Sequence, residues 1–144
     1  MKVAGLFSRR SFNIDSLAVG ETDRSDVSCI TIVSSGDETT LAQIEKQLNK
    51  KIDVIKIKSF TEEEAVTREL MLIKVKYSLK NRREIAETCG FLNAGIIDIS
   101  KNLMTIQICD TPERTNLLLD MLSSFPIVEV ARTGILALPK CDLS

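Results

Sequence analysis

Residues 69–77 hold the feature that most constrains the fold of this chain. Every second residue there is apolar or aromatic, in the order Met71, Ile73, Val75 and Tyr77. Lys74 and Lys76 fall between them. Because side chains alternate between the two faces of a β-strand, this pattern predicts a strand with one face in a core and the other toward water.

The segments after this strand complete a recognisable order. Ile85, Cys89 and Leu92 share one stripe of a helix predicted over residues 80–92. The later elements are strands over residues 94–100 and 103–109, a helix over residues 111–125 and a strand over residues 127–138. Strand, helix, strand, strand, helix, strand is the ferredoxin-like βαββαβ arrangement, in the α+β class.

The helix over residues 111–125 has clear start and stop signals. Thr111 suits the N-cap, Pro112 suits the first helical position, and Pro126 ends the helix. The apolar stripe of this helix consists of Leu117, Leu118, Met121, Leu122 and Phe125. We expect the stripe to belong to the core and not to a groove for a partner.

The first half of the chain repeats this plan without its leading strand. Its predicted elements are a short amphipathic helix over residues 5–11, strands over residues 14–20 and 27–34, a helix over residues 35–51 and a strand over residues 52–57. Asn13 lies at the junction of the first helix and the first strand, a position where sites are often built. The sequence predicts one truncated domain at residues 1–60, a linker at 61–67 and a complete ferredoxin-like domain at 68–144.

The absent strand has a physical consequence. It would be a central strand of its sheet, and without it the strand over residues 52–57 loses its neighbour. Either another chain supplies the strand or the sequence starts late. We favour a late start, with about 10 to 20 residues preceding it, from ordinary strand and loop lengths.

Composition excludes several classes of protein. The 144 residues carry 19 basic and 20 acidic side chains, a net charge of -1, which gives no long-range attraction to nucleic acid or an anionic membrane. No apolar run reaches the length of a membrane span, and the N-terminus lacks the pattern of a secretory signal. We therefore expect a soluble, cytoplasmic protein.

The cysteines and the missing histidines argue against catalysis by this chain. Cys29, Cys89, Cys109 and Cys141 form no C-x-x-C pair, and the sequence has no histidine to complete a zinc site or to activate a thiol. We expect reduced core thiols and no metal. A small enzyme that uses Cys89 or Cys109 remains an alternative.

Four stretches resemble one family, the small regulatory subunit of acetolactate synthase, also called acetohydroxyacid synthase. They are GLFSRRSFNIDSLAVGETD, VSCITIVSSGDETTLAQIEKQLNKKIDVIKI, RELMLIKVK and IVEVARTGILAL. FNIDSLAV, QIEKQLNKKIDVIKI and VEVARTG are the most specific parts. The resemblance covers nearly the whole chain and implies an N-terminal ACT domain followed by a second ferredoxin-like domain.

The resemblance also implies a function without chemistry in this chain. Small subunits of the family form homodimers through their ACT domains and bind a large catalytic subunit that uses thiamine diphosphate, magnesium and FAD. They raise its activity and make it sensitive to a branched-chain amino acid, typically valine. This places the chain in valine, leucine and isoleucine biosynthesis, as a regulatory subunit and not as an enzyme on its own.

Asn13 and Ile14 are the effector-binding residues that the resemblance implies. The Asn13 amide would bond the charged groups of the amino acid, and Ile14 would lie beside its aliphatic side chain. The other half of the family's pocket, an N-x-x-G turn after the leading strand, is absent from this sequence. On residue preference alone, Asn13 reads as a turn residue.

Three arginines could either bind a partner or simply be solvated surface residues. Arg9 and Arg10 could contact the acids of a partner or an effector carboxylate, but arginines on a short helix are mostly solvated. Arg132 could mark a subunit interface, although an outward-facing strand residue is the default expectation.

Two other functions compete with the regulatory subunit. The first is a free-standing ACT protein that senses an amino acid and acts on another target. The second is an RNA-binding module, because such modules share the βαββαβ order. Residues 103–109 lack the aromatic side chains on which bases stack, which disfavours RNA.

Overall fold

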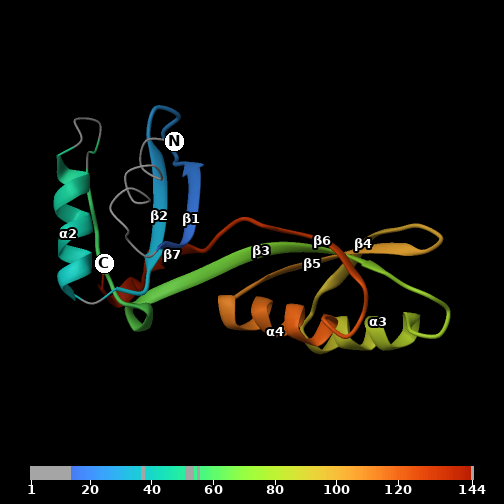
Figure 1. The fold of residues 1–144 in the computed structure, drawn as a ribbon. Helices are drawn as coiled ribbons and strands as arrows, with labels where there is room; N and C mark the ends of the chain where they lie inside the picture. The colour runs from blue at the N-terminus through green and yellow to red at the C-terminus, as the bar shows by residue number, and fades with distance from the viewer. Residues whose placement is uncertain (1–13, 37, 51–53, 55, 144) are drawn as a thin grey trace. The chain divides into compact units, whose positions relative to one another are not determined.

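The computed structural model describes residues 14–36, 38–50, 54 and 56–143 (Figure 1). It divides into two compact units. The first unit holds the described residues up to Val66 together with those from Ala137 to Leu143, and the second runs from Thr67 to Leu136. The mixed architecture confirms the predicted α+β class.

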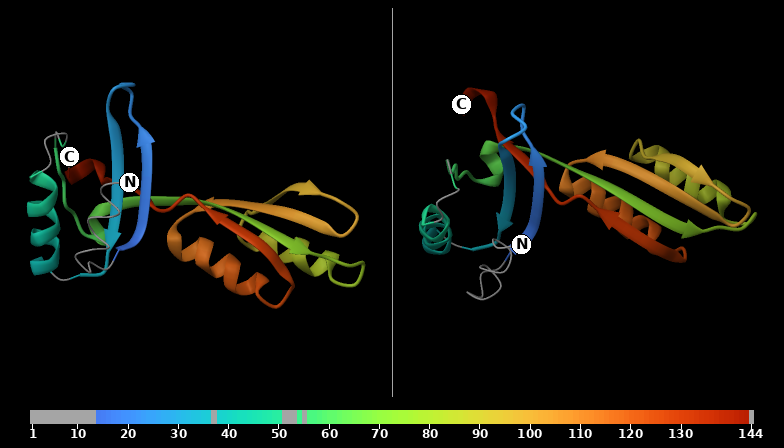
Figure 2. Two further views of the ribbon diagram at one scale, coloured as in Figure 1. Left: turned by 45° about the horizontal axis from the view of Figure 1, so that its top comes forward. Right: turned by 90° about the horizontal axis from the view of Figure 1, so that it is seen from above.

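The second unit has the complete βαββαβ order. Its elements are β3 (Ala65–Lys76), which begins in the first unit, α3 (Arg82–Phe91), β4 (Gly95–Ile99), β5 (Leu103–Asp110), α4 (Pro112–Leu122) and β6 (Ile127–Arg132). The strands lie in the order β4-β5-β3-β6, and each neighbouring pair is antiparallel. Both helices cover the same face of this sheet (Figure 2). This is the ferredoxin-like fold that the sequence predicts.

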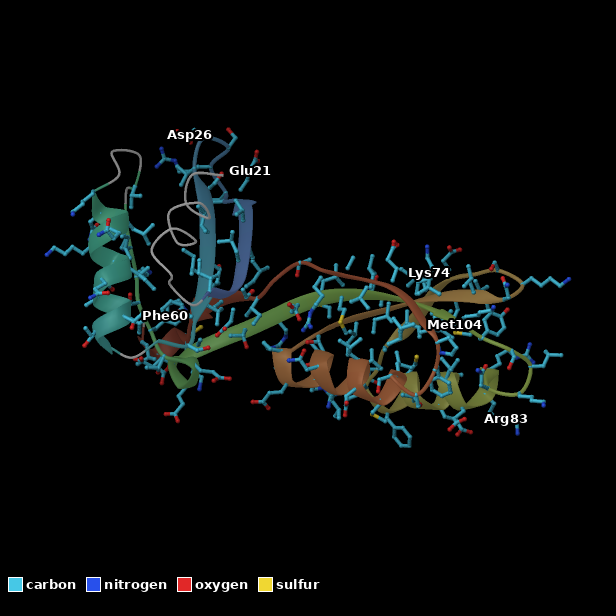
Figure 3. The ribbon with its side chains drawn as sticks, viewed as in Figure 1. Glu21, Asp26, Phe60, Lys74, Arg83 and Met104 are labelled. Carbon is cyan, nitrogen blue, oxygen red and sulfur yellow. The ribbon has the colours of Figure 1, made fainter. Side chains whose placement is uncertain are left out.

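The alternation along β3 positions the core. Met71 lies opposite Ile108, Ile73 opposite Ile106, and Val75 opposite Met104. All six are buried, and they meet a second set of buried residues from the helices and the segment after α3: Ile85, Cys89, Leu92, Leu118 and Leu122. Figure 3 shows Met104 on the helix side of the sheet and Lys74 on the other. Each buried aliphatic side chain contributes about 1.5–3 kcal/mol by leaving water.

Helix α4 begins as predicted, and four of the five residues of the predicted stripe lie in the core or pack against it: Leu118, Met121, Leu122 and Phe125. Thr111 caps it, with the hydroxyl accepting a hydrogen bond from the Arg114 amide, and Pro112 is the first helical residue. Leu117, predicted to be buried, is 47% exposed. Leu118 and Leu122 already face the sheet, and Thr115 completes their row at helical spacing, so Leu117 is turned about 100° away.

The described part of the first unit contains a hairpin and a helix. Strands β1 (Ile14–Glu21) and β2 (Ser28–Ser34) pair antiparallel, and α2 (Glu38–Asn49) follows. Ala18 and Ile44 are the buried apolar residues here. A short 3-10 helix (Glu62–Glu64), β7 (Leu136–Pro139) and a final 3-10 helix (Cys141–Leu143) complete the unit, and β7 pairs with β3.

The strand expected over residues 52–57 is not observed among the residues described there. Residues 51–53 and 55 lie outside the described range, and residues 54 and 56–58 belong to neither sheet. A strand needs a neighbouring backbone to form its ladder, and this segment has no such pairing within the described residues. The predicted helix over residues 5–11 lies outside the described residues.

Residues 61–67, the predicted linker, contain regular structure. Glu62–Glu64 form a 3-10 helix, and β3 begins at Ala65. Thr61 and Glu64 form a capping box, in which the Glu64 carboxylate accepts from the Thr61 amide and hydroxyl at 2.9 Å each. These bonds lower the pKa of Glu64 and fix the start of β3.

The last predicted strand, residues 127–138, is broken into β6 and β7. Gly134 between them has φ 87°, a left-handed conformation that a strand cannot contain. Thr133 keeps the segment attached, because its amide donates to the Leu70 carbonyl at 3.0 Å and its hydroxyl accepts from the Leu70 amide at 3.1 Å. The break therefore redirects the chain without freeing it from β3.

Candidate functional site

The predicted effector residues lie at the start of β1. Asn13 falls outside the described residues, so its role stays a prediction. Ile14 is the first residue of β1, is half-buried, and lies opposite Ser34 at the end of β2. The side chain is thus neither in a core nor fully in water, which suits a residue that contacts a small apolar ligand.

A β-bulge shapes the backbone at this position. The β1–β2 register shifts between Ile14 and Ser16, which leaves Asp15 without a direct partner across the hairpin. The Asp15 carboxylate instead accepts a hydrogen bond from the Ser35 hydroxyl, which lies just before α2. Bulges change the direction of neighbouring side chains, so this arrangement sets where Ile14 points.

Gly36 allows the backbone before α2 to pass close to Thr40, in the first turn of that helix. A Cβ atom added there would lie 2.5 Å from the Cβ of Thr40, closer than two side-chain carbons can come. The residue between β2 and α2 must therefore be a glycine in this conformation.

An open hollow of about 380 Å³ lies elsewhere in the first unit. It is lined by Lys58, Ser59, Phe60, Glu64, Pro139 and Leu143, and Phe60 is labelled in Figure 3. The Glu64 carboxylate is already engaged by Thr61, and neither Ile14 nor Asp15 lines the hollow. The hollow is therefore separate from the predicted effector residue Ile14.

The second unit contains a buried charge that the sequence reading missed. Glu69 is 4% exposed and lies on the core face of β3, in phase with Met71. Its carboxylate accepts from the Arg132 guanidinium, with Nε at 3.0 Å and Nη2 at 2.5 Å, and from the Thr115 hydroxyl at 3.2 Å. Arg132 Nη2 also donates to the Asn116 side chain at 2.6 Å. A glutamate at a core position of the alternating pattern was the signal that a cation must lie nearby.

This network corrects the expectation for Arg132. The side chain does not simply face outward from β6, because Arg132 lies opposite Met71 and shares the helix side of the sheet with Glu69. Charge pairing with a buried carboxylate outweighs full hydration of the guanidinium. The network therefore links β3, β6 and α4, while the Arg132 side chain stays 34% exposed, so its role at a subunit interface stays a prediction.

A second ion pair lies at the start of α4. Arg114 Nε donates to the Asp110 carboxylate at 2.7 Å, and the Thr111 amide donates to the same carboxylate at 2.7 Å. The hydrogen bond from Arg114, then that from Thr111, lowers the pKa of Asp110. Asp110 lies just before the positive end of the helix, where a carboxylate is favoured.

The expectation of four core thiols is wrong for three of them. Cys29, Cys109 and Cys141 are exposed, and only Cys89 is buried. Cys109 lies in β5, where buried and outward-facing residues alternate, and Cys29 lies at the start of β2, where three successive residues are exposed. Burial raises the pKa of the Cys89 thiol, so this group is a core residue and a poor nucleophile.

Neither a metal centre nor a membrane span is found in the part of the chain that the structure describes. No group of three or more cysteine, aspartate or glutamate side chains there could hold an ion. None of the helices described is long and apolar enough to cross a bilayer.

Comparison with known proteins assigns both halves of the chain. Residues 1–56 match the family model of the AHAS small subunit-like ACT domain, and residues 68–141 match that of the small subunit of acetolactate synthase. The chain belongs to the acetolactate synthase small-subunit family. The resemblance described from the sequence is thus confirmed.

Individual members of the acetolactate synthase small-subunit family agree with this assignment. The acetolactate synthase small subunit of Mycolicibacterium smegmatis is 44% identical over 139 residues, which cover 96% of this chain and 82% of that protein. The isozyme 3 small subunit of Salmonella typhimurium is 39% identical over 142 residues, covering 98% and 87%. The crystal structure of the Thermotoga maritima small subunit matches with a TM-score of 0.88 at 36% identity, over 96% of this chain and 87% of that one.

Proposed function

We propose that this chain is the regulatory, non-catalytic subunit of an acetolactate synthase in branched-chain amino acid biosynthesis. It binds the large catalytic subunit and raises its activity. The observation that supports this proposal is the match of both halves, in order, to the two domain models of the small-subunit family. Thiamine diphosphate, magnesium and FAD belong to the large subunit in this proposal.

The absence of histidine agrees with a chain that does no chemistry. The buried thiol of Cys89 has a raised pKa, and no acid–base pair for its activation follows from the sequence. Regulation by binding requires none of these groups.

The proposal includes feedback inhibition by valine or a related amino acid. Asn13 and Ile14 would contact the effector at an interface between the ACT domains of a homodimer. The half-buried position of Ile14 and the bulge after it support this role. An apolar side chain next to a polar amide suits an aliphatic amino acid better than a polar one.

The first experiment measures acetolactate formation by the cognate large subunit in three mixtures. These are the large subunit alone, with this chain, and with this chain plus increasing valine. We expect activity to rise on mixing and to fall with valine. No rise in activity would contradict the proposed function, and valine binding without any effect on the large subunit would favour a free-standing ACT sensor.

Matched variants test the effector residues. Asn13→Ala or Ile14→Ala should raise the valine concentration for half-inhibition about tenfold or more, because lost methylene contacts and an unpaired polar group each weaken ligand binding. Val19→Ala is the control, since Val19 lies on the same strand and is 50% exposed. If the control shifts inhibition as much as Ile14→Ala, the assignment of Ile14 is wrong.

A further inference from the structure

One end of the second unit gathers three connections. The Tyr77 amide donates to the Asn102 carbonyl at 2.9 Å, so the turn after β3 lies against the turn between β4 and β5. The Lys76 amide donates to the Pro126 carbonyl at 2.9 Å, which brings in the connection before β6. Figure 1 shows the β3–α3 and β4–β5 turns at the same end of the sheet.

This end carries an unusual concentration of positive charge. It contributes five exposed cations, which we call the basic tip: Lys76, Lys80, Arg82, Arg83 and Lys101. Neither residues 76–83 nor residues 100–102 contain an acid, so five of the chain's 19 basic residues lie here and all 20 acidic residues lie elsewhere. The basic tip is a local feature of a chain whose net charge is -1.

The fold of the second unit does not use these charges. None of the five cations forms an ion pair with another residue that the structure describes, unlike Arg24, Arg114 and Arg132. Arg82 and Arg83 are the first two residues of α3, where the helix dipole disfavours cations, and Glu84 follows them in the same turn. Violations of such local rules occur mostly at functional sites.

A large apolar side chain projects from the middle of the basic tip. Leu79 is 83% exposed, more than any other large apolar residue described. It lies between Lys76 and Lys80 in a turn with two internal hydrogen bonds. Asn81 Oδ1 accepts from the Ser78 amide at 2.8 Å, and the Ser78 carbonyl accepts from the Arg82 amide at 3.0 Å. An exposed apolar anchor surrounded by charges has the composition of a protein-binding surface.

We propose that the basic tip docks on an acidic surface of the large catalytic subunit, with Leu79 in an apolar depression of that surface. This inference rests on the proposed function, which supplies the partner. The five cations steer and orient the association with the large subunit, and Leu79 forms the apolar contact from which water is excluded.

Nucleic acid fits the tip less well than protein does. The one aromatic residue there is Tyr77, which is half-buried and whose hydroxyl donates to the Ser100 carbonyl. No aromatic face is therefore presented for a base to stack on.

The test measures the affinity of the intact chain for the purified large subunit at low and high salt. The combined variant Lys80→Glu, Arg82→Glu, Lys101→Glu should weaken binding by about tenfold or more at low salt and reduce the salt dependence. Lys46→Glu, Lys50→Glu, Lys56→Glu is the control, with the same change in net charge on exposed residues of the first unit. Leu79→Ser should weaken binding about tenfold at both salt concentrations.

Several results would overturn the docking proposal. Equal losses in the two charge variants would show an effect of net charge alone, and unchanged binding in the tip variants would show that the tip lies outside the interface. The tip would be assigned to nucleic acid by a third result: the wild type binds single-stranded RNA, and the tip variant does not but still assembles with the large subunit. Failure of the wild type to bind the large subunit would instead contradict the proposed function itself.

Discussion

Helices α3 and α4 pack on the same sheet but begin in opposite chemical settings. Helix α4 starts with Asp110, a Thr111 cap and Pro112, all of which favour a helix N-terminus. Helix α3 starts with Asn81, whose side chain bonds the Ser78 amide instead of capping the helix, and continues with two arginines. Each first turn holds one acid, Glu84 in α3 and Glu113 in α4, so the two starts differ in the cap and in the number of arginines.

The largest expected effect comes from the network that ties α4 to the sheet. Arg132→Leu should lower the free energy of unfolding of the second unit by about 3 kcal/mol, because it leaves the buried Glu69 carboxylate without its cation. Hydrogen exchange at the amides of β3 and β5 measures this loss.

The control for this loss is a pair of charges on the open face of the sheet. Lys74 and Glu129 lie directly opposite each other there. Glu129→Leu should change stability by no more than about 0.5 kcal/mol, the usual range for surface positions. A loss equal to that of Arg132→Leu would mean that burial of Glu69 is not the cause.

The two helix caps should differ in a direct comparison. Thr111→Ala should destabilise the second unit by about 1 kcal/mol, the usual effect of losing an N-cap hydroxyl. Asn81→Ala removes only the bond to the Ser78 amide within a solvated turn, so the loss should be smaller. Urea denaturation of the two variants, side by side, measures the difference, and equal losses would show that both helices are capped equally well.

A smaller effect, of opposite sign, is expected at the start of α3. Arg82→Glu should stabilise the second unit by about 0.3–1 kcal/mol, since a carboxylate complements the helix dipole. The same substitution should weaken binding to the large subunit if the basic tip docks there. Thermal unfolding and binding measured on one sample separate the two effects, and a variant that loses both stability and binding would contradict the comparison.

The smallest effect concerns the pH dependence of α4. The pKa of Asp110 is lowered in the folded chain, so the stabilisation from this carboxylate is complete above its unfolded pKa, about 3.9, and is lost as pH falls through the lower folded value. Asp110→Asn should therefore be less stable than the wild type at neutral pH and approach it in acid. Arg114→Gln should diminish this acid transition, because Arg114 is the first cause of the lowered pKa.

Periodicity was enough to predict much of the second unit. The alternation around Ile73 located β3 and its buried face, and Thr111 with Pro112 located the start of α4. These features depend on residues that are close in sequence, so local sequence patterns predict them. The effector residue Ile14 was placed at a strand start by the same reasoning, and its role stays a prediction.

Features that depend on distant partners were missed. Glu69 and Arg132 meet across the sheet although 63 residues separate them in sequence, and no local pattern pairs them. Leu117 was predicted to be buried because it stands next to Leu118 in the helix. Which of these leucines is covered depends on how the helix packs on the sheet, and Leu117 is exposed. The break at Gly134 depends on a dihedral angle that a run of apolar residues does not reveal.

The second unit is inserted in the sequence of the first unit, because residues 137–143 belong to the first unit again. Residues 67–136 leave the first unit through β3 and come back through β7, and the Lys140 amide donates to the Glu64 carbonyl at 2.8 Å on the return. A single cut cannot separate the two units cleanly. Exchange of units between relatives would have to transfer residues 67–136 as a cassette with two junctions, leaving Ala137 to Ser144 with the recipient.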